Sequence, residues 1–245
     1  DLIKIPILFT TLESAELIKY ASNAFLATKI SFINEISILC EEVNADVRAV
    51  AKGMGLDTRI GREFLNAGPG YGGSCFPKDT QALVRIAKEN RASSRIVKAV
   101  IETNEIQKAR MIMKIRNALG GNECNKTIGI LGLTFKPETD DMRDAPSLTI
   151  LPKLIENGCR IHAHDPQGID EAKKILPSKI DYFDDIYAAL DGVNAVVLMT
   201  EWNAYRNLNM KKVKDKLKNP IFVDLRNIFE PKEMKKLGFN YYSIG

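Results

Sequence analysis

The segment TIGILGL at residues 127–133 is a short apolar run rich in β-branched residues, which is the pattern of a buried β-strand. Four later runs have the same character: RIHAHD at 160–165, NAVVLMT at 194–200, PIFVDL at 220–225 and YYSIG at 241–245. Helical segments separate these runs, and the first of them is predicted to begin at Pro146 and to end at Gly158. Strands that alternate with helices predict a parallel sheet with helices on both faces.

The residues before 122 predict helices instead of strands. The first helix spans 14–44, a stretch without glycine or proline. Its apolar residues recur at helical spacing: Ile18, Phe25, Phe32, Ile36 and Leu39. About thirty residues is long compared with the average of ~10–14, so we expect this helix to carry a subunit contact. Further helices are expected at 45–54, 77–89 and 93–119.

These patterns predict two domains. Residues 1–121 form an α-helical dimerisation domain, and residues 122–245 form an α/β Rossmann-like parallel-sheet domain. The character of the sequence changes at GGNECNK, residues 120–126. Because the chain opens at Asp1 without an initiator methionine, we expect it to be a piece of a longer protein.

Composition excludes several classes of protein. With 245 residues, 45% of them hydrophobic, the chain can bury a sizeable core. The formal net charge of +4 lacks the surplus of a nucleic-acid binder, and no apolar run approaches the ~20 residues of a spanning helix. The first ten residues do not have the order of a signal peptide. We expect a cytoplasmic protein with reduced thiols, no metal site, and neither a nucleic-acid nor a membrane partner.

The segment GPGYGGSCFPKD, residues 68–79, holds the strongest chemical signal. Its four glycines let the backbone approach a ligand closely, and Pro77 favours the start of a helix just after Cys75. The positive end of that helix and the nearby Lys78 favour the thiolate, which predicts a nucleophile. Asp79 is placed to orient or deprotonate a water molecule. The alternative is that Cys75 is a small buried side chain in a glycine turn.

Lys19 and Asn23 are spaced i, i+4 and therefore share one face of the long predicted helix. Their neighbours make this the least polar part of the helix, where a solvated lysine is poorly explained. A cation and an amide held together can stabilise an oxyanion or hold a water molecule beside a substrate. The equally weighted alternative is a lysine at the helix edge beside an exposed asparagine.

The first strand of the α/β domain is not followed by the G-x-G-x-x-G pattern of dinucleotide-binding folds. Lys136 stands at the C-terminal end of that strand, and Arg226 follows the strand at 220–225. Open α/β sheets bind ligands at this edge, so both cations are predicted to contact phosphate, with ordinary surface charges as the alternative. Asp165 also ends a strand, where a ribose-binding acid would stand in a dinucleotide-binding fold. Because the glycines of that fold are missing, Asp165 indicates the topology and not a ribose site.

Several blocks, in this order, resemble the nucleotide-sugar dehydrogenases that include UDP-glucose and GDP-mannose dehydrogenases. The blocks are SAELIKYASNAFLATKISFINE at 14–35, GLDTRIG at 55–61, FLNAGPGYGGSCFPKDT at 64–80, GLTFKPETDDMRDAPS at 132–147, TEW at 200–202 and DLRN at 224–227. The form GYGGSCFPKD is most similar to the UDP-glucose 6-dehydrogenase branch. The resemblance implies an NAD-dependent double oxidation of UDP-glucose to UDP-glucuronate through a cysteine thioester.

The resemblance also implies roles for individual residues. Cys75 matches the nucleophile, Lys19 and Asn23 match the pair that steadies the oxyanion, and Asp79 matches the acid that acts with Lys19 on water. The residues that resemble the sugar-nucleotide site are Asn66, Ala67, Gly68, Pro69, Gly70, Tyr71, Gly72, Phe135, Lys136 and Arg226. The resemblance implies a homodimer in which Arg59 reaches the site of the other subunit. Lys78 and Arg143 resemble residues that contact NAD.

The sequence departs from the family in two respects. Leu225 stands where many members have glycine, and the N-terminal NAD-binding domain of the family is absent. We therefore expect the central and C-terminal domains of such an enzyme, with linker at residues 1–13 and no turnover by this piece alone. The alternatives are a GDP-mannose 6-dehydrogenase and a non-enzymatic nucleotide-binding scaffold.

Overall fold

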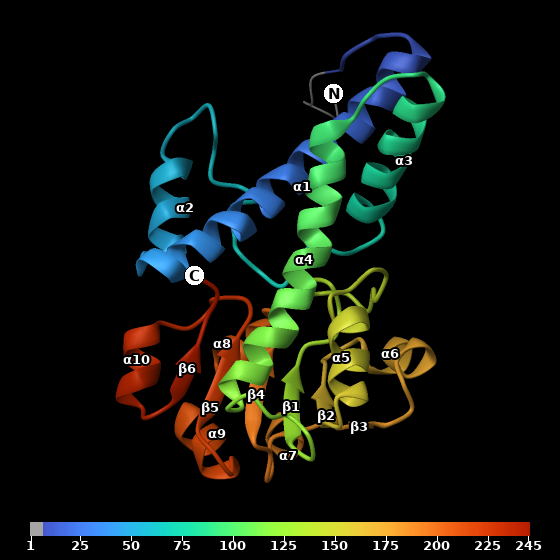
Figure 1. The fold of residues 1–245 in the computed structure, drawn as a ribbon. Helices are drawn as coiled ribbons and strands as arrows, with labels where there is room; N and C mark the ends of the chain where they lie inside the picture. Colours follow the sequence, from blue (N-terminus) through green and yellow to red (C-terminus); the bar gives the residue numbers. More distant parts are fainter. Residues whose placement is uncertain (1–6) are drawn as a thin grey trace, which may run out of the picture.

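The computed structural model describes residues 7–245, so the first six residues of the predicted linker lie outside the described part. Helices come first, as predicted: α1 (Leu12–Val43), α2 (Val47–Gly55), α3 (Phe76–Glu89) and α4 (Arg95–Ala118). The strands follow: β1 (Thr127–Leu131), β2 (Arg160–His164), β3 (Ile180–Tyr182), β4 (Ala195–Leu198), β5 (Ile221–Asp224) and β6 (Asn240–Tyr242). Short helices separate them: α5 (Ser147–Glu156), α6 (Ile169–Ile175), α7 (Ile186–Ala189), α8 (Asn203–Arg206), α9 (Met210–Lys216) and α10 (Pro231–Lys236). A helical part followed by a parallel-sheet part confirms the predicted fold class (Figure 1).

The six strands form one parallel sheet in the order β3-β2-β1-β4-β5-β6. In the middle of the sheet, Ile128 of β1 pairs with Ile161 of β2 on one side and with Ala195 of β4 on the other. The order reverses between β1 and β4, which is the switch point where open α/β sheets bind ligands. The sequence does not predict β3, because its three residues, IDY, place a charged residue between two apolar ones and do not form an apolar run.

Local signals explain where the helices begin and end. The side chain of Thr11 accepts a hydrogen bond from Ser14 N at the start of α1, and Asn44 ends the helix at φ 56°. Pro146 precedes α5 and Gly158, at φ 90°, follows it, as the sequence predicts. The long helix α1 therefore agrees with its predicted span to within two residues.

Helix α4 packs against both parts of the chain. Its C-terminal half contributes Met111 and Ile115 to the core that also contains Ile128 and Val223 of the sheet. Figure 1 shows α4 running from the helical part down to the face of the sheet. We propose that residues 1–121 and 122–245 are two domains whose interface is formed largely by this helix.

No helix within residues 7–245 combines the length and the apolar character needed to cross a bilayer. Over the same residues, no cluster of three or more histidine, cysteine, aspartate or glutamate side chains is placed to hold a metal ion.

Candidate active site

We call residues 67–75 the glycine loop. This loop ends at Cys75, which directly precedes α3. The Cys75 side chain is exposed, with Ser74 Oγ 3.6 Å from its sulfur. Gly73 has φ +84°, and its N–H donates to the backbone oxygen of Arg143 at 2.7 Å. Gly68, Gly70 and Gly73 also have the spacing G-x-G-x-x-G, but no strand precedes them within residues 7–67, so they lack the context of a dinucleotide fingerprint. The loop instead presents a thiol at the start of a helix.

One helical turn beyond Cys75, a buried carboxylate meets two side chains of α1. Asn23 Nδ2 donates to Asp79 Oδ2 at 2.6 Å, and Lys19 Nζ lies 3.8 Å from the same oxygen. Asp79 is fully buried and its Oδ1 has no hydrogen-bond partner in the described chain, although Lys78 Nζ lies 3.7 Å away. The i, i+4 spacing of Lys19 and Asn23 thus brings both groups to one carboxylate. An ammonium, an amide and a carboxylate in contact can bind an oxyanion or activate a water molecule.

A cavity of about 570 Å³ lies between the glycine loop and the C-terminal ends of β1, β4 and β5. Cys75, Glu201 and Thr139 are among the residues that line it. Most of the predicted sugar-nucleotide residues line it too: Asn66, Gly68, Gly70, Tyr71, Gly72, Phe135, Lys136 and Arg226. Burial raises the pKa of the Tyr71 hydroxyl to about 12, so this part of the wall stays uncharged at neutral pH.

Arg226 is held firmly at the edge of this cavity. Its Nε donates to the backbone oxygen of Met199 at 2.7 Å, and its Nη2 donates to that of Phe135 at 3.0 Å. Its Nε also lies 3.0 Å from Glu201 Oε2. Leu225, where many family members have glycine, is fully buried in the core. Leu225 packs in the core, and the next residue, Arg226, still lines the cavity.

Lys136 stands at the same edge, above the ring of Phe135, with Nζ 5.4 Å from the ring centroid. The cations that follow β1 and β5 therefore line one cavity together with the thiol.

Other predicted residues are not among those that line this cavity, and these include Lys19, Asn23 and Asp79. Ala67 and Pro69 belong to the glycine loop but are buried, and Ala67 lines a neighbouring pocket. Arg59 is 87% exposed and is paired with Asp57 at 2.6 Å, so within one chain it does not reach the site.

The two residues predicted to contact NAD are exposed cations close to the cysteine loop. Lys78 belongs to the first turn of α3. Arg143 is paired with Asp141 at 2.8 Å, and the hydrogen bonds from Arg143 hold the pKa of Asp141 below its ordinary value.

Three buried amides that the sequence does not single out hold the glycine loop. Asn34 Oδ1 accepts from Gly68 N at 2.8 Å, and Gln107 Nε2 donates to Gly68 O at 2.8 Å. Asn104 Oδ1 accepts from Tyr71 N at 2.8 Å, and its Nδ2 donates to Tyr71 O at 3.1 Å. The sequence does contain a signal for two of these amides, because Asn104 and Gln107 stand at buried-face positions of α4 between apolar residues at helical spacing.

The chain matches one protein family over most of its length. Residues 13–106 match the central domain of the UDP-glucose/GDP-mannose dehydrogenase family, and residues 129–231 match its UDP binding domain. The chain belongs to this family, which confirms the resemblance read from the sequence blocks.

Named relatives agree with this assignment. The chain is 50% identical to UDP-glucose 6-dehydrogenase TuaD of Bacillus subtilis over 240 residues, which are 98% of this chain and 52% of that protein. It is 49% identical over 240 residues to UDP-glucose 6-dehydrogenase of Rhizobium meliloti, covering 98% of this chain and 55% of the relative. A UDP-glucose dehydrogenase structure from Pyrobaculum islandicum has a TM-score of 0.88 at 36% identity, covering 99% of this chain and 54% of that one. The chain thus spans about half the length of the curated relatives it matches.

Proposed function

We propose that this chain carries the nucleophile and the sugar-nucleotide site of a UDP-glucose 6-dehydrogenase. Such an enzyme oxidises UDP-glucose to UDP-glucuronate through a cysteine thioester, with NAD as the oxidant. The observation that carries the proposal is that the exposed Cys75 lines the same cavity as Lys136 and Arg226. A substrate with an oxidisable carbon at one end and a diphosphate at the other matches this combination of a thiol and two cations.

In the proposed mechanism the C6 alcohol first loses a hydride and its hydroxyl proton and becomes an aldehyde, and the Cys75 sulfur then adds to the aldehyde carbon and forms a thiohemiacetal. Loss of a second hydride and of the hydroxyl proton gives a thioester, and water then releases the acid and regenerates the thiol. Lys19 and Asn23 stabilise negative charge on the C6 oxygen, and Asp79 accepts a proton from the attacking water. Lys136 and Arg226 hold the diphosphate while the glycine loop encloses the sugar nucleotide.

NAD, when bound, accepts the hydride in each oxidation. We propose that Lys78 and Arg143 contact its phosphates. Since no strand among the described residues is followed by a dinucleotide fingerprint, we propose that the other contacts to NAD come from outside this sequence.

Thiol protection tests the substrate site. UDP-glucose is expected to slow the alkylation of Cys75 by iodoacetamide at least tenfold, because the sugar covers the sulfur. Cys124, which is also exposed, is the internal control and should react at an unchanged rate. Equal rates at Cys75 with and without UDP-glucose would contradict the proposed site, and stronger protection by GDP-mannose would favour the GDP-mannose enzyme.

A turnover measurement tests whether this chain holds the whole NAD site or only part of it. The chain mixed with UDP-glucose and NAD is expected to give no steady rise in NADH absorbance. Steady turnover would show that residues 1–245 hold the whole cofactor site. Protection of Cys75 without turnover is the combined result that the proposal requires.

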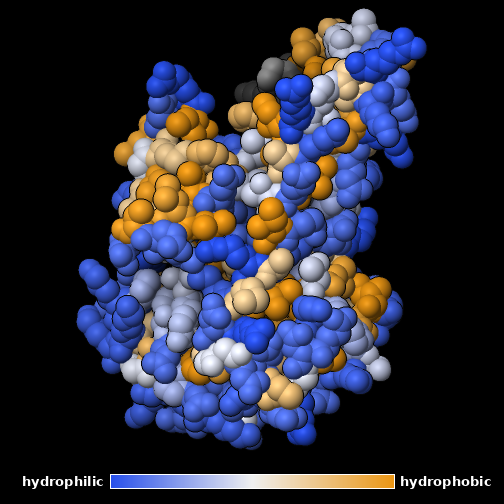
Figure 2. Space-filling view, in the orientation of Figure 1, coloured by the Kyte–Doolittle hydropathy of each residue, from blue (hydrophilic) through white to orange (hydrophobic). Residues whose placement is uncertain are grey.

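We further propose that α1 forms the contact of a homodimer. Phe25, Phe32 and Leu39, spaced by seven residues, are 65%, 45% and 57% exposed. Figure 2 shows hydrophobic residues gathered over the region where α1 and α2 lie. Large apolar side chains that are exposed on one helix at this spacing are typical of a subunit interface. A dimer would also give Arg59 a route to the cavity of a second copy.

Phe32→Glu is expected to convert the dimer to a monomer, as measured by sedimentation, because it places a charge in the centre of this face. Ile106→Glu, which changes an exposed residue of α4, is the control and should leave the dimer intact. A wild-type chain that sediments as a monomer would refute the proposed interface.

A further inference from the structure

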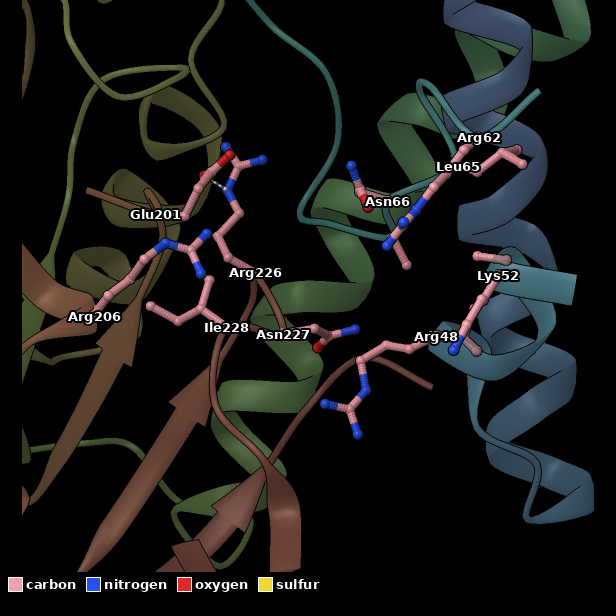
Figure 3. A pocket seen from close by; sticks show the side chains of 13 residues that line it. Arg48, Lys52, Arg62, Leu65, Asn66, Glu201, Arg206, Arg226, Asn227 and Ile228 are labelled. Atoms are coloured by element: carbon pink, nitrogen blue, oxygen red, sulfur yellow. Dashed lines mark ion pairs between the residues drawn. The ribbon is translucent and has the colours of Figure 1, made fainter. Parts of the chain in front are cut away.

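A second cavity, of about 330 Å³, lies beside the one that contains Cys75. Residues of α2, of the loop that precedes the glycines, and of the segments after β4 and β5 line it. In Figure 3, Arg48, Lys52 and Arg62 lie on one wall, and Arg206 and Arg226 lie on the opposite wall. We call this cavity the basic pocket, since five cationic side chains from separate parts of the chain meet there.

The positive charge of the basic pocket is only partly neutralised. Glu201 is the only carboxylate among the described lining residues, and it pairs with Arg226 at 3.0 Å. Arg48 pairs with two carboxylates outside the cavity lining, Asp46 at 3.3 Å and Glu230 at 3.2 Å. The remaining three cations have no ion-pair partner within residues 7–245: Lys52, Arg62 and Arg206.

Lys52, Arg62 and Arg206 are exposed and unpaired, so an anion that enters the cavity can bind them without breaking an existing ion pair. Guanidinium groups bind phosphate oxygens through two parallel hydrogen bonds, which makes arginine the preferred side chain for this task. The volume lies at the lower end of the range for small-molecule sites, ~300–1,000 Å³, and is too small for a polymer. The occupant that matches this charge and size is a small molecule with several negative charges.

We propose that the basic pocket binds a small metabolite carrying two phosphate groups, at a site separate from the proposed sugar-nucleotide cavity. Lys52, Arg62 and Arg206 line only the basic pocket, whereas Cys75 and Lys136 line only the other cavity. The two cavities share Asn66, Glu201 and Arg226, so they adjoin each other. The site does not depend on the dehydrogenase chemistry proposed above.

Calorimetric titration with inorganic pyrophosphate at low ionic strength tests this site. In the presence of saturating UDP-glucose, whose sugar and uridine groups at the two ends of the diphosphate fit the larger cavity and not the basic pocket, one equivalent of pyrophosphate is expected to bind. The double variant Lys52→Gln/Arg206→Gln should weaken this binding at least tenfold, because it removes two of the three unpaired charges. It should leave the affinity for UDP-glucose within twofold of wild type, which also shows that the variant is folded.

The matched control is Lys179→Gln/Lys211→Gln, which removes two exposed lysines elsewhere and should change pyrophosphate binding less than twofold. Equal weakening in both double variants would show general attraction by net charge and would refute the site. Absence of pyrophosphate binding once UDP-glucose is bound would refute it as well. If UDP-glucose itself does not bind, the proposed function fails, while the contrast between the two double variants still decides the basic pocket.

Discussion

Asn104 carries two of the hydrogen bonds that hold the glycine loop, one to the N–H and one to the carbonyl oxygen of Tyr71. Tyr71 is buried, and so are both hydrogen bonds. A single side chain on α4 therefore satisfies the backbone of a residue 33 positions away, and the loop keeps its shape without secondary structure of its own.

Asn104→Ala is expected to lower the free energy of unfolding by about 2–4 kcal/mol, because it leaves a buried donor and a buried acceptor unpaired. Urea unfolding measures the change. Asn117→Ala, an exposed position on the same helix, is the matched control and should cost less than about 0.5 kcal/mol. Equal effects at the two positions would show that the hydrogen bonds to Tyr71 do not stabilise the fold.

The four cysteines differ in reactivity by environment. Cys75 and Cys124 are exposed, whereas Cys40 and Cys159 are buried, and burial raises the pKa of the Cys159 thiol to about 12. Because the thiolate is the reactive form, iodoacetamide at about pH 8 is expected to modify two thiols in the native chain and four in urea. Mass spectrometry of the peptides identifies them, and early modification of Cys159 would contradict its burial.

At the scale of elements, the position of the thiol depends on how the glycine loop meets the turn after β1. The φ of Gly73 lies in the left-handed region, and a Cβ atom there would lie 2.7 Å from the Phe135 ring. The loop and the β1 turn therefore approach each other more closely than any other residue type allows at this position.

Gly73→Ala is expected to destabilise the chain by about 2–4 kcal/mol, from left-handed backbone strain and from the contact with Phe135. Gly53→Ala is the contrasting control, since it lies within α2, has no positive φ, and its Cβ would meet nothing within 4 Å. That substitution should stabilise the chain by up to about 1 kcal/mol. Thermal unfolding measures both, and a neutral Gly73→Ala would show that the loop moves freely.

On the scale of the whole molecule, Glu41 joins three distant segments. It accepts hydrogen bonds from Arg110 and Lys114 of α4 and from the backbone N–H of Gly245, each at 2.8–3.0 Å. Burial alone would raise its pKa, but the hydrogen bonds from Lys114 and Gly245 outweigh that effect and hold the pKa of Glu41 below its ordinary value. The two proposed domains and the end of the sheet are therefore tied together by one carboxylate.

Glu41→Gln is expected to lower the free energy of unfolding by about 1–3 kcal/mol at neutral pH. Because the folded pKa is depressed, the stabilisation is present above the unfolded pKa and is lost as the pH falls through the folded value. The difference between wild type and variant should therefore shrink in acid, as urea unfolding across the pH range would show. Glu42→Gln, at the exposed neighbouring position, should have little effect at any pH, and a pH-independent effect of Glu41→Gln would refute the ionic contribution.

The sequence by itself determined the spans of α1 to α5, five of the six strands and their parallel arrangement, since periodicity, caps and glycine positions act within a few residues of each other. It also placed Cys75 and Asp79 one helical turn apart, because Cys75 caps α3 and Asp79 lies in its first turn. Only the tertiary structure decided which amides hold the glycine loop and which cations surround the basic pocket. Asn34 and Gln107 are 73 positions apart, and Lys52 and Arg206 are further apart still, so long-range packing alone brings them together.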